Sequence, residues 1–211
     1  MDISDSISRE RIEHVHAVAL SIGEVAVAFA RVQRAPRMPD GLRETDVEHS
    51  FHLGLTAVEL AAMLYPRLDR GLIMQFAQVH DLPEVITGDV WTMDITDEQR
   101  ADKEERESRA TERLLETLPP YLAELLRRYE DQTEPEARFV RLVDKCAPAI
   151  LAMVSPDSST FIDDYGFDRQ TFDQAAGRNS KRVHAMFPEF PEMLDIYDSF
   201  RHAQRSIHFT D

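Results

Sequence analysis

Two histidines and two aspartates offer the clearest chemistry in this sequence. They are His49, the adjacent pair His80 and Asp81, and Asp144. Imidazole nitrogens and carboxylate oxygens are ligands that divalent transition metals take in proteins, and a site with few protein ligands leaves positions for water and a substrate. These residues are therefore candidate metal ligands, provided that the fold brings them to one point.

The His80-Asp81 pair alone also fits a plainer interpretation. A histidine followed by an aspartate after an amphipathic segment is typical of a capped, solvated helix end. With 8 histidines among 211 residues, such a pair also arises by chance. The choice between the two interpretations depends on the residues that accompany the pair and on the elements that carry them.

The spacing of apolar residues predicts that these elements are helices. A long amphipathic helix is expected over about residues 12–32, and its apolar stretch 17–30 is predicted to be a core helix. A second helix is expected to begin at a capping box formed by Thr45 and Glu48, and a third to span about residues 69–80. Packed helices could then direct the four candidate ligands to one point.

The remainder of the chain has the same helical character. Capping boxes are predicted at residues 96–99 and 133–136, and helices at about 172–187 and 193–206. No strand series, fixed repeat or low-complexity linker divides the sequence. The predicted fold class is therefore all-α, with a single domain over residues 1–211.

Several short motifs around the candidate ligands resemble one known family. Glu48-His49-Ser50, the run from His80 to Asp89 (HDLPEVITGD) and Asp144-Lys145 together resemble the HD-domain metal-dependent phosphohydrolases. The glutamate three residues after His-Asp, the Thr-Gly-Asp that follows, and Gln33-Arg34-Ala35-Pro36 resemble the 5′-deoxynucleotidases of that family more narrowly. The resemblance spans about residues 29–150 and implies an HD-type helical bundle.

The resemblance implies that His49, His80, Asp81 and Asp144 hold one divalent metal ion. Manganese, cobalt, iron, nickel and zinc all suit such ligands. Members of the family with two metals place further histidines between the His-Asp pair and the last aspartate, and this sequence has none there. A bound ion of this kind polarises a phosphoryl oxygen and lowers the pKa of a bound water.

Four further residues receive roles from the same resemblance. Glu84 would handle the proton and position the attacking water, Asp89 would act in catalysis and contact the nucleotide, and Arg34 would bind phosphate through its forked donors. Trp91, the only tryptophan, could stack on a base or sugar. Plainer interpretations stay open: a solvated loop residue for Arg34, a turn or N-cap for Asp89, and a core side chain for Trp91.

The function expected from these residues is hydrolysis of the 5′-phosphate ester of (deoxy)nucleoside monophosphates. The family's deoxynucleotidases carry a tryptophan where this chain has Ala35, which leaves sugar selectivity open. One alternative is a deoxynucleoside triphosphate triphosphohydrolase that releases tripolyphosphate and needs further cations, for which Arg31, Arg37, Arg43 and Lys145 are candidates. The other is a non-catalytic module that binds a nucleotide or a partner protein.

Composition sets limits on partners and location. The net charge of −15 disfavours binding to long nucleic acids, which depends on many lysines and arginines. The single Cys146 has no disulfide partner and is expected to be buried and inert, and residues 17–30 are shorter than the roughly 20 apolar residues of a membrane span. A cytoplasmic protein with a small-molecule nucleotide substrate is expected, without a membrane partner.

Two segments receive no catalytic role from the sequence. The charged run over residues 94–113 is interpreted as a solvated helix face without a function. The C-terminal helices at about 168–207 match no motif and could supply an interface or a lid. A homodimer is expected from the resemblance alone.

Overall fold

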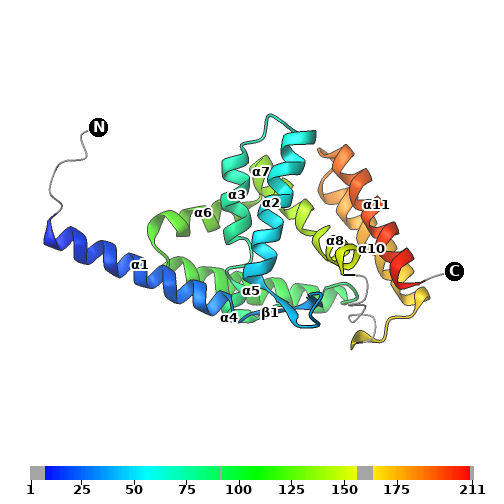
Figure 1. Ribbon diagram of the computed structural model, residues 1–211, viewed down its shortest axis with the longest axis horizontal. Coiled ribbons are helices and arrows are strands. Elements are labelled where there is room, and N and C mark those ends of the chain that lie inside the picture. Colours follow the sequence, from blue (N-terminus) through cyan, green and yellow to red (C-terminus); the bar gives the residue numbers. More distant parts are fainter. Residues whose placement is uncertain (1–7, 91, 156–163, 210–211) are drawn as a thin grey trace.

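The structure is a computed structural model that describes residues 8–90, 92–155 and 164–209 (Figure 1). Its N-terminal part contains a long helix, a two-stranded hairpin and two helices: α1 (Arg9–Phe29), β1 (Gln33–Arg37), β2 (Arg43–Thr45), α2 (Asp46–Leu64) and α3 (Arg70–Val79). The helices that follow are α4 (Glu84–Thr87), α5 (Asp97–Thr117), α6 (Pro120–Asp131), α7 (Pro135–Asp144), α8 (Ala147–Val154), α10 (Arg169–Met186) and α11 (Pro191–His208). The predicted all-α fold class is confirmed.

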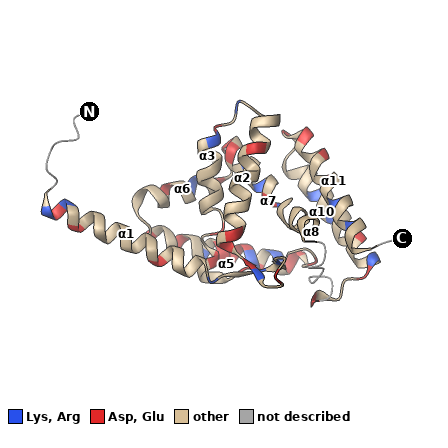
Figure 2. Ribbon diagram, in the orientation of Figure 1, with Lys and Arg blue, Asp and Glu red and all other residues tan. Residues whose placement is uncertain are grey.

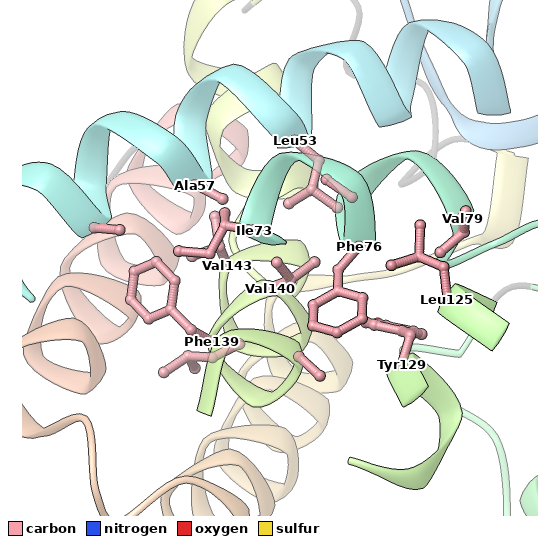
Figure 3. Close-up of a cluster of buried hydrophobic side chains, with 14 of the residues drawn as sticks. Leu53, Ala57, Ile73, Phe76, Val79, Leu125, Tyr129, Phe139, Val140 and Val143 are labelled. Carbon is pink, nitrogen blue, oxygen red and sulfur yellow. The ribbon is translucent and has the colours of Figure 1, made fainter. Parts of the chain in front are cut away.

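The core lies between α2, α3, α6 and α7 (Figure 3). Leu53 of α2, Phe76 of α3, and Phe139 and Val140 of α7 have at most 1% of their surface exposed, and Tyr129 of α6 packs beside Phe76. Burial of each large apolar side chain contributes roughly 1.5–3 kcal/mol. This packing fixes the start of α2 relative to the ends of α3 and α7, which are the places that carry the candidate metal ligands.

Two of the three predicted capping boxes are present. Thr45 caps α2 with Glu48, and Thr96 caps α5 with Gln99, each through reciprocal bonds between side chain and backbone. The third prediction, at residues 133–136, is wrong: α7 begins after Glu134, without a side-chain cap, at Pro135. Proline can start a helix without a cap because it has no backbone N–H to satisfy.

A short hairpin stands where the sequence predicted only a loop. β1 and β2 are antiparallel, with Gln33 opposite Thr45 and Arg37 opposite Arg43, and Gly41 adopts a φ of 83° in the connection. The strands are too short to show an alternating pattern, and Pro36 interrupts β1. The hairpin places Arg34 and Ala35 beside the start of α2, since β2 ends where that helix begins.

The prediction that residues 17–30 form a core helix is wrong. Phe29 is the single buried residue that the structure gives to α1, and Val15, Leu20 and Val27 are 51%, 70% and 55% exposed. The helix extends away from the other helices (Figure 1) and carries few charged residues beyond its first turns (Figure 2). By length and composition alone it is one helix that could cross a membrane, a test that signal sequences and core helices also pass.

The two C-terminal helices predicted near residues 172–187 and 193–206 are present as α10 and α11. They lie side by side, and α11 packs on α8 (Figure 1). Phe187 and Met193 join the main core, while Phe172 contributes to a smaller apolar cluster. The C-terminal third is therefore packed into the body of the molecule.

Candidate functional site

His49 lies in the first turn of α2, which the Thr45 cap fixes. Its side chain is 1% exposed, and Nε2 is 3.1 Å from Oδ1 of Asp144 at the end of α7. Lys145 donates to the other oxygen of Asp144 at 2.7 Å. The start of one core helix and the end of another thus bring together two residues that are far apart in the chain.

His80 ends α3 with its ring in a defined orientation. Nδ1 lies 2.9 Å from the carbonyl oxygen of Ala77, and because a carbonyl can only accept, this nitrogen carries the proton. Nε2 is buried without a hydrogen-bond partner, although it lies 2.9 Å from Oδ2 of Asp81. The unbonded nitrogen therefore faces a carboxylate, an arrangement typical of a metal-binding histidine held by a backbone carbonyl.

The candidate ligands converge. One ligand atom each of His49, His80 and Asp144 lies within 4.8 Å of the other two, and the imidazole rings are 5.2 Å apart. Asp81 lies beside this group, with Oδ2 3.8 Å from Nε2 of His49. The structure brings together all four residues that the sequence nominated.

Electrostatics suits these residues to a cation. Burial lowers the pKa of His49 to about 4, and the charge of Arg34 adds to this effect, so this imidazole is neutral near pH 7. Burial raises the pKa of Asp81, but the charges of His80 and Arg34 outweigh it, and the net pKa is well below its usual value. The pKa of Asp144 is lowered similarly, chiefly by Lys145 against the effect of burial.

His80 completes a donor set that fits a divalent metal. Burial alone would lower its pKa, but Asp81 and then Asp144 raise it above the usual value. An imidazole whose positive charge is stabilised by two buried carboxylates lies where a cation is attracted. Two imidazoles, two ionised carboxylates and an unbonded buried nitrogen therefore fit the metal that the sequence motifs imply.

Arg34 points from β1 into the acidic side of the site. Its side chain is 11% exposed, and Nη1 lies 2.6 Å from Oδ2 of Asp81 and 3.3 Å from Oδ1 of Asp46. Its Nε lies 3.5 Å from Oε2 of Glu44. The plainer interpretation of Arg34 as a solvated loop residue is therefore wrong, because it is held among buried carboxylates.

Glu84 and Asp89 lie on the same side. Glu84 begins the short helix α4, is 6% exposed, and has Oε2 3.9 Å from Nη1 of Arg34. Burial raises its pKa far above the usual value, and the charges of Asp81 and Asp89 add to the rise. Asp89 accepts a hydrogen bond from the backbone N–H of Ala35 at 3.3 Å, which ties the segment after α4 to the hairpin. Trp91 lies outside the described residues.

These groups line a cavity of about 340 Å³. Such a volume lies at the lower end of the roughly 300–1,000 Å³ of small-molecule sites. Ala35, Asp81, Glu84 and Asp144 contribute to its wall, as do residues of α5, α10 and α11. The cavity therefore joins the convergent ligands to the part of the chain that had no motif.

The sequence missed several cations of this cavity. Of the cations nominated for a triphosphate, only Lys145 lines it, since Arg37 and Arg43 bind Asp164 and Arg31 is exposed. The cations that do line it, besides Arg34 and Lys145, are Arg100, Lys103, Arg141, Arg182 and Arg201. The run 94–113 thus contributes to the site, and its interpretation as only a solvated face is wrong. Clustering is the one signal, because burial and then the charge of Arg182 lower the pKa of Arg100.

Comparison with known proteins gives consistent results. A family model described as HD domain matches residues 30–190. The 5′-deoxynucleotidase HDDC2 of Mus musculus is 27% identical over 177 residues, which cover 82% of this chain and 84% of that protein. The Homo sapiens protein of the same name is 33% identical over 99 residues, 46% of this chain and 48% of that protein. A crystal structure of a predicted metal-dependent phosphohydrolase from Magnetospirillum magnetotacticum is 25% identical, with a TM-score of 0.63 over 90% of this chain and 94% of that one.

Proposed function

This chain belongs to the HD-domain family, as its motifs predicted, and from that membership we propose that it hydrolyses the 5′-phosphate ester of (deoxy)nucleoside monophosphates. The observation that carries the proposal is the convergence of His49, His80 and Asp144 on one point, with Asp81 beside them. The relatives named 5′-deoxynucleotidase support this substrate class.

The four converging residues would hold one divalent ion, which supplies charge to a phosphoryl oxygen and lowers the pKa of a water molecule. Arg34 lies where its N–H groups can donate to phosphate oxygens in the cavity. The Ala35 backbone N–H holds Asp89 at the wall, where its carboxylate can accept from a sugar hydroxyl or base. These contacts would orient the ester without a large apolar surface.

Glu84 is placed to move the proton. Its raised pKa means that it carries a proton in this environment, and its carboxyl group lines the cavity. As water attacks phosphorus and the P–O bond to the 5′ carbon's oxygen breaks, Glu84 would give its proton to that leaving oxygen. The carboxylate that results can then take the proton lost by the attacking water, which balances the reaction to a nucleoside and orthophosphate.

A second candidate substrate is a deoxynucleoside triphosphate. The cations of α5, α10 and α11 on the cavity wall favour it, because they could neutralise a longer phosphate tail. Hydrolysis at the α-phosphate would release tripolyphosphate, whereas the proposed reaction releases orthophosphate.

The test is product identification with a matched pair of variants. Purified protein loaded with Mn²⁺ is given dAMP, AMP and dATP, and ion chromatography identifies the phosphate released. Glu84→Gln is expected to lower turnover about 10²- to 10⁴-fold while it keeps its metal. Glu105→Gln, on the exposed side of α5, should match the wild type. Metal-loaded wild type that hydrolyses none of the three would contradict the proposal, and tripolyphosphate would select the second candidate.

We also propose that the chain forms a homodimer in which α1 lies against a second copy. The apolar side chains of Val15, Leu20 and Val27 are exposed on α1, and other described elements leave them uncovered. A second copy offers the same apolar residues for self-complementary contact. The cytoplasmic location stays a prediction of the sequence.

A further inference from the structure

The guanidinium of Arg34 lies inside a second cluster of acidic groups, next to the converging ligands. One carboxylate oxygen each of Asp46, Asp81 and Glu84 lies within 4.8 Å of the other two. Nη1 of Arg34 is 2.6 Å, 3.3 Å and 3.9 Å from oxygens of Asp81, Asp46 and Glu84 respectively. The positive charge therefore lies among all three members of the cluster.

Two of these carboxylates are buried and incompletely bonded. Asp46 is 0% exposed and Glu84 is 6% exposed. Oδ2 of Asp46 and Oε2 of Glu84 have no hydrogen-bond partner among the described residues. Buried oxygens of this kind repel one another unless a cation or protons neutralise them. The cluster therefore has more capacity for positive charge than a single guanidinium satisfies.

Asp81 belongs to both sides of the site. The same Oδ2 atom that meets Arg34 lies 2.9 Å from Nε2 of His80 and 3.8 Å from Nε2 of His49. On one side of this carboxylate are the two imidazoles, and on the other is the guanidinium. The arrangement is that of a centre with places for two cations that share one carboxylate, with a side chain already in one of them.

We propose that Arg34 serves as the second cation of this centre, filling the place between Asp46, Asp81 and Glu84 so that the chain binds a single metal ion. The inference rests on the proposed function, because it concerns the same site. Asp46 and Glu44 act as positioning residues that hold Arg34 through Nη1 and Nε. A fixed guanidinium supplies charge and directed N–H donors together, which a second metal ion would not.

The experiment counts bound ions. Chelator-treated protein is titrated with Mn²⁺, excess ion is removed, and the ions per chain are measured by mass spectrometry of the metal. The wild type is expected to bind one ion. Arg34→Gln, which removes the charge, is expected to bind two, with coupling between the ions visible in the electron paramagnetic resonance spectrum. Arg34→Lys, which keeps the charge, should bind one.

Matched variants locate the second ion. Asp46→Asn in the Arg34→Gln background is expected to return the count to one, because it removes a carboxylate of the vacated place. Arg43→Gln, which removes an arginine of the same hairpin, should leave the count at one. Circular dichroism verifies folding, and Arg34→Met gives a second neutral variant with the same expected count should Arg34→Gln fail to fold.

The inference is overturned if folded Arg34→Gln and Arg34→Met bind one ion or none, or if the wild type binds two. A wild type that binds one ion but hydrolyses no nucleotide defeats only the proposed function, and a second ion in Arg34→Gln would still support the inference. The two proposals therefore fail separately.

Discussion

Asp46 occupies an unusual position for an acidic side chain. It begins α2, where a carboxylate is favoured by the helix dipole, yet it is 0% exposed. Burial and then the charge of Asp81 raise its pKa to about 7, against the lowering effect of Arg34. Ionisation of Asp46 is therefore unfavourable in the folded, metal-free chain.

This shift predicts a dependence of stability on pH. A carboxyl whose pKa is raised on folding stabilises the fold below the pKa of the unfolded chain, near 4, and loses that contribution as the pH rises to about 7. Asn cannot ionise, so metal-free Asp46→Asn should gain stability relative to the wild type between pH 4 and 8. The expected gain is on the order of 2 kcal/mol, since each unit of pKa shift corresponds to about 1.4 kcal/mol.

Thermal melts at several pH values, in the presence of a chelator, measure this difference. Asp164→Asn, which removes a carboxylate of the exposed hairpin surface, is the control and should show no such trend. A difference between Asp46→Asn and the wild type that stays constant from pH 4 to 8 would show that Asp46 is already ionised at low pH.

At this scale the sequence predicted the residues with distinctive donors better than those with common ones. His49, His80 and Asp144 could be nominated because few side chains have an imidazole and a matching motif. Glu44 and Asp46 could not, because a carboxylate near a helix start is ordinary there. Their contact with Arg34 depends on the hairpin, which the sequence read as a loop.

At the scale of elements, α1 is the helix that other described elements cover least. Its apolar face carries Leu20 and Val27, which are 70% and 55% exposed. Patches of exposed apolar surface in folded proteins commonly mark contact with another molecule. The proposed contact with a second copy therefore makes a prediction that involves no catalytic group.

Lys substituted at both Leu20 and Val27 is expected to convert the dimer to a monomer, because charges would be buried in the interface. The stability of the monomer should change by no more than about 0.5 kcal/mol per site, since both positions are exposed. Size-exclusion chromatography with light scattering gives the molar mass. Met63→Lys with Val154→Lys, at other exposed apolar positions, is the control. A monomeric wild type at tens of micromolar rules the contact out.

The two kinds of helix prediction differ in reliability for a physical reason. Apolar spacing states which residues of a helix share a face, and it identified α1, α2, α3 and α11 correctly as helices. Spacing does not state whether a second element covers that face, and this is why α1 was assigned to the core. Caps at Thr45 and Thr96 are local and could be predicted, since the bonds join residues three positions apart.

For the whole molecule, a bound metal would stabilise the folded chain by binding the native state and not the unfolded one. At an ion concentration 100-fold above the dissociation constant, the gain is about 2.7 kcal/mol. In a domain of this size each kcal/mol shifts Tm by about 2–4 °C. A chelator should therefore lower Tm by roughly 5–10 °C, and added Mn²⁺ should restore it.

Asp144→Asn should show little response to either treatment, because it loses a ligand atom of the converging group. Asp198→Asn, which changes an aspartate paired with His184 on the outer part of α11, should respond like the wild type. Differential scanning calorimetry compares the three proteins. An equal response of Asp144→Asn and the wild type to the chelator would place the stabilising ion elsewhere.

The wall of the cavity shows what the sequence could not predict at this scale. Lys103, Arg182 and Arg201 come from α5, α10 and α11, and they approach the site through the packing of whole helices. Charged residues on amphipathic helices most often face solvent, so composition gives no sign that these three converge. Only the arrangement in space separates them from the other charges of those helices.

The position of α10 and α11 along the chain also sets the order in which the ribosome delivers the parts of the site. All residues nominated to hold the ion precede Lys145, whereas Arg182, Tyr197 and Arg201 follow much later. During synthesis, the nascent chain can thus gather His49, His80 and Asp144 before it possesses the wall that confines a substrate. Capture of the ion and competence to retain a nucleotide are therefore separable events in the life of a newly made molecule.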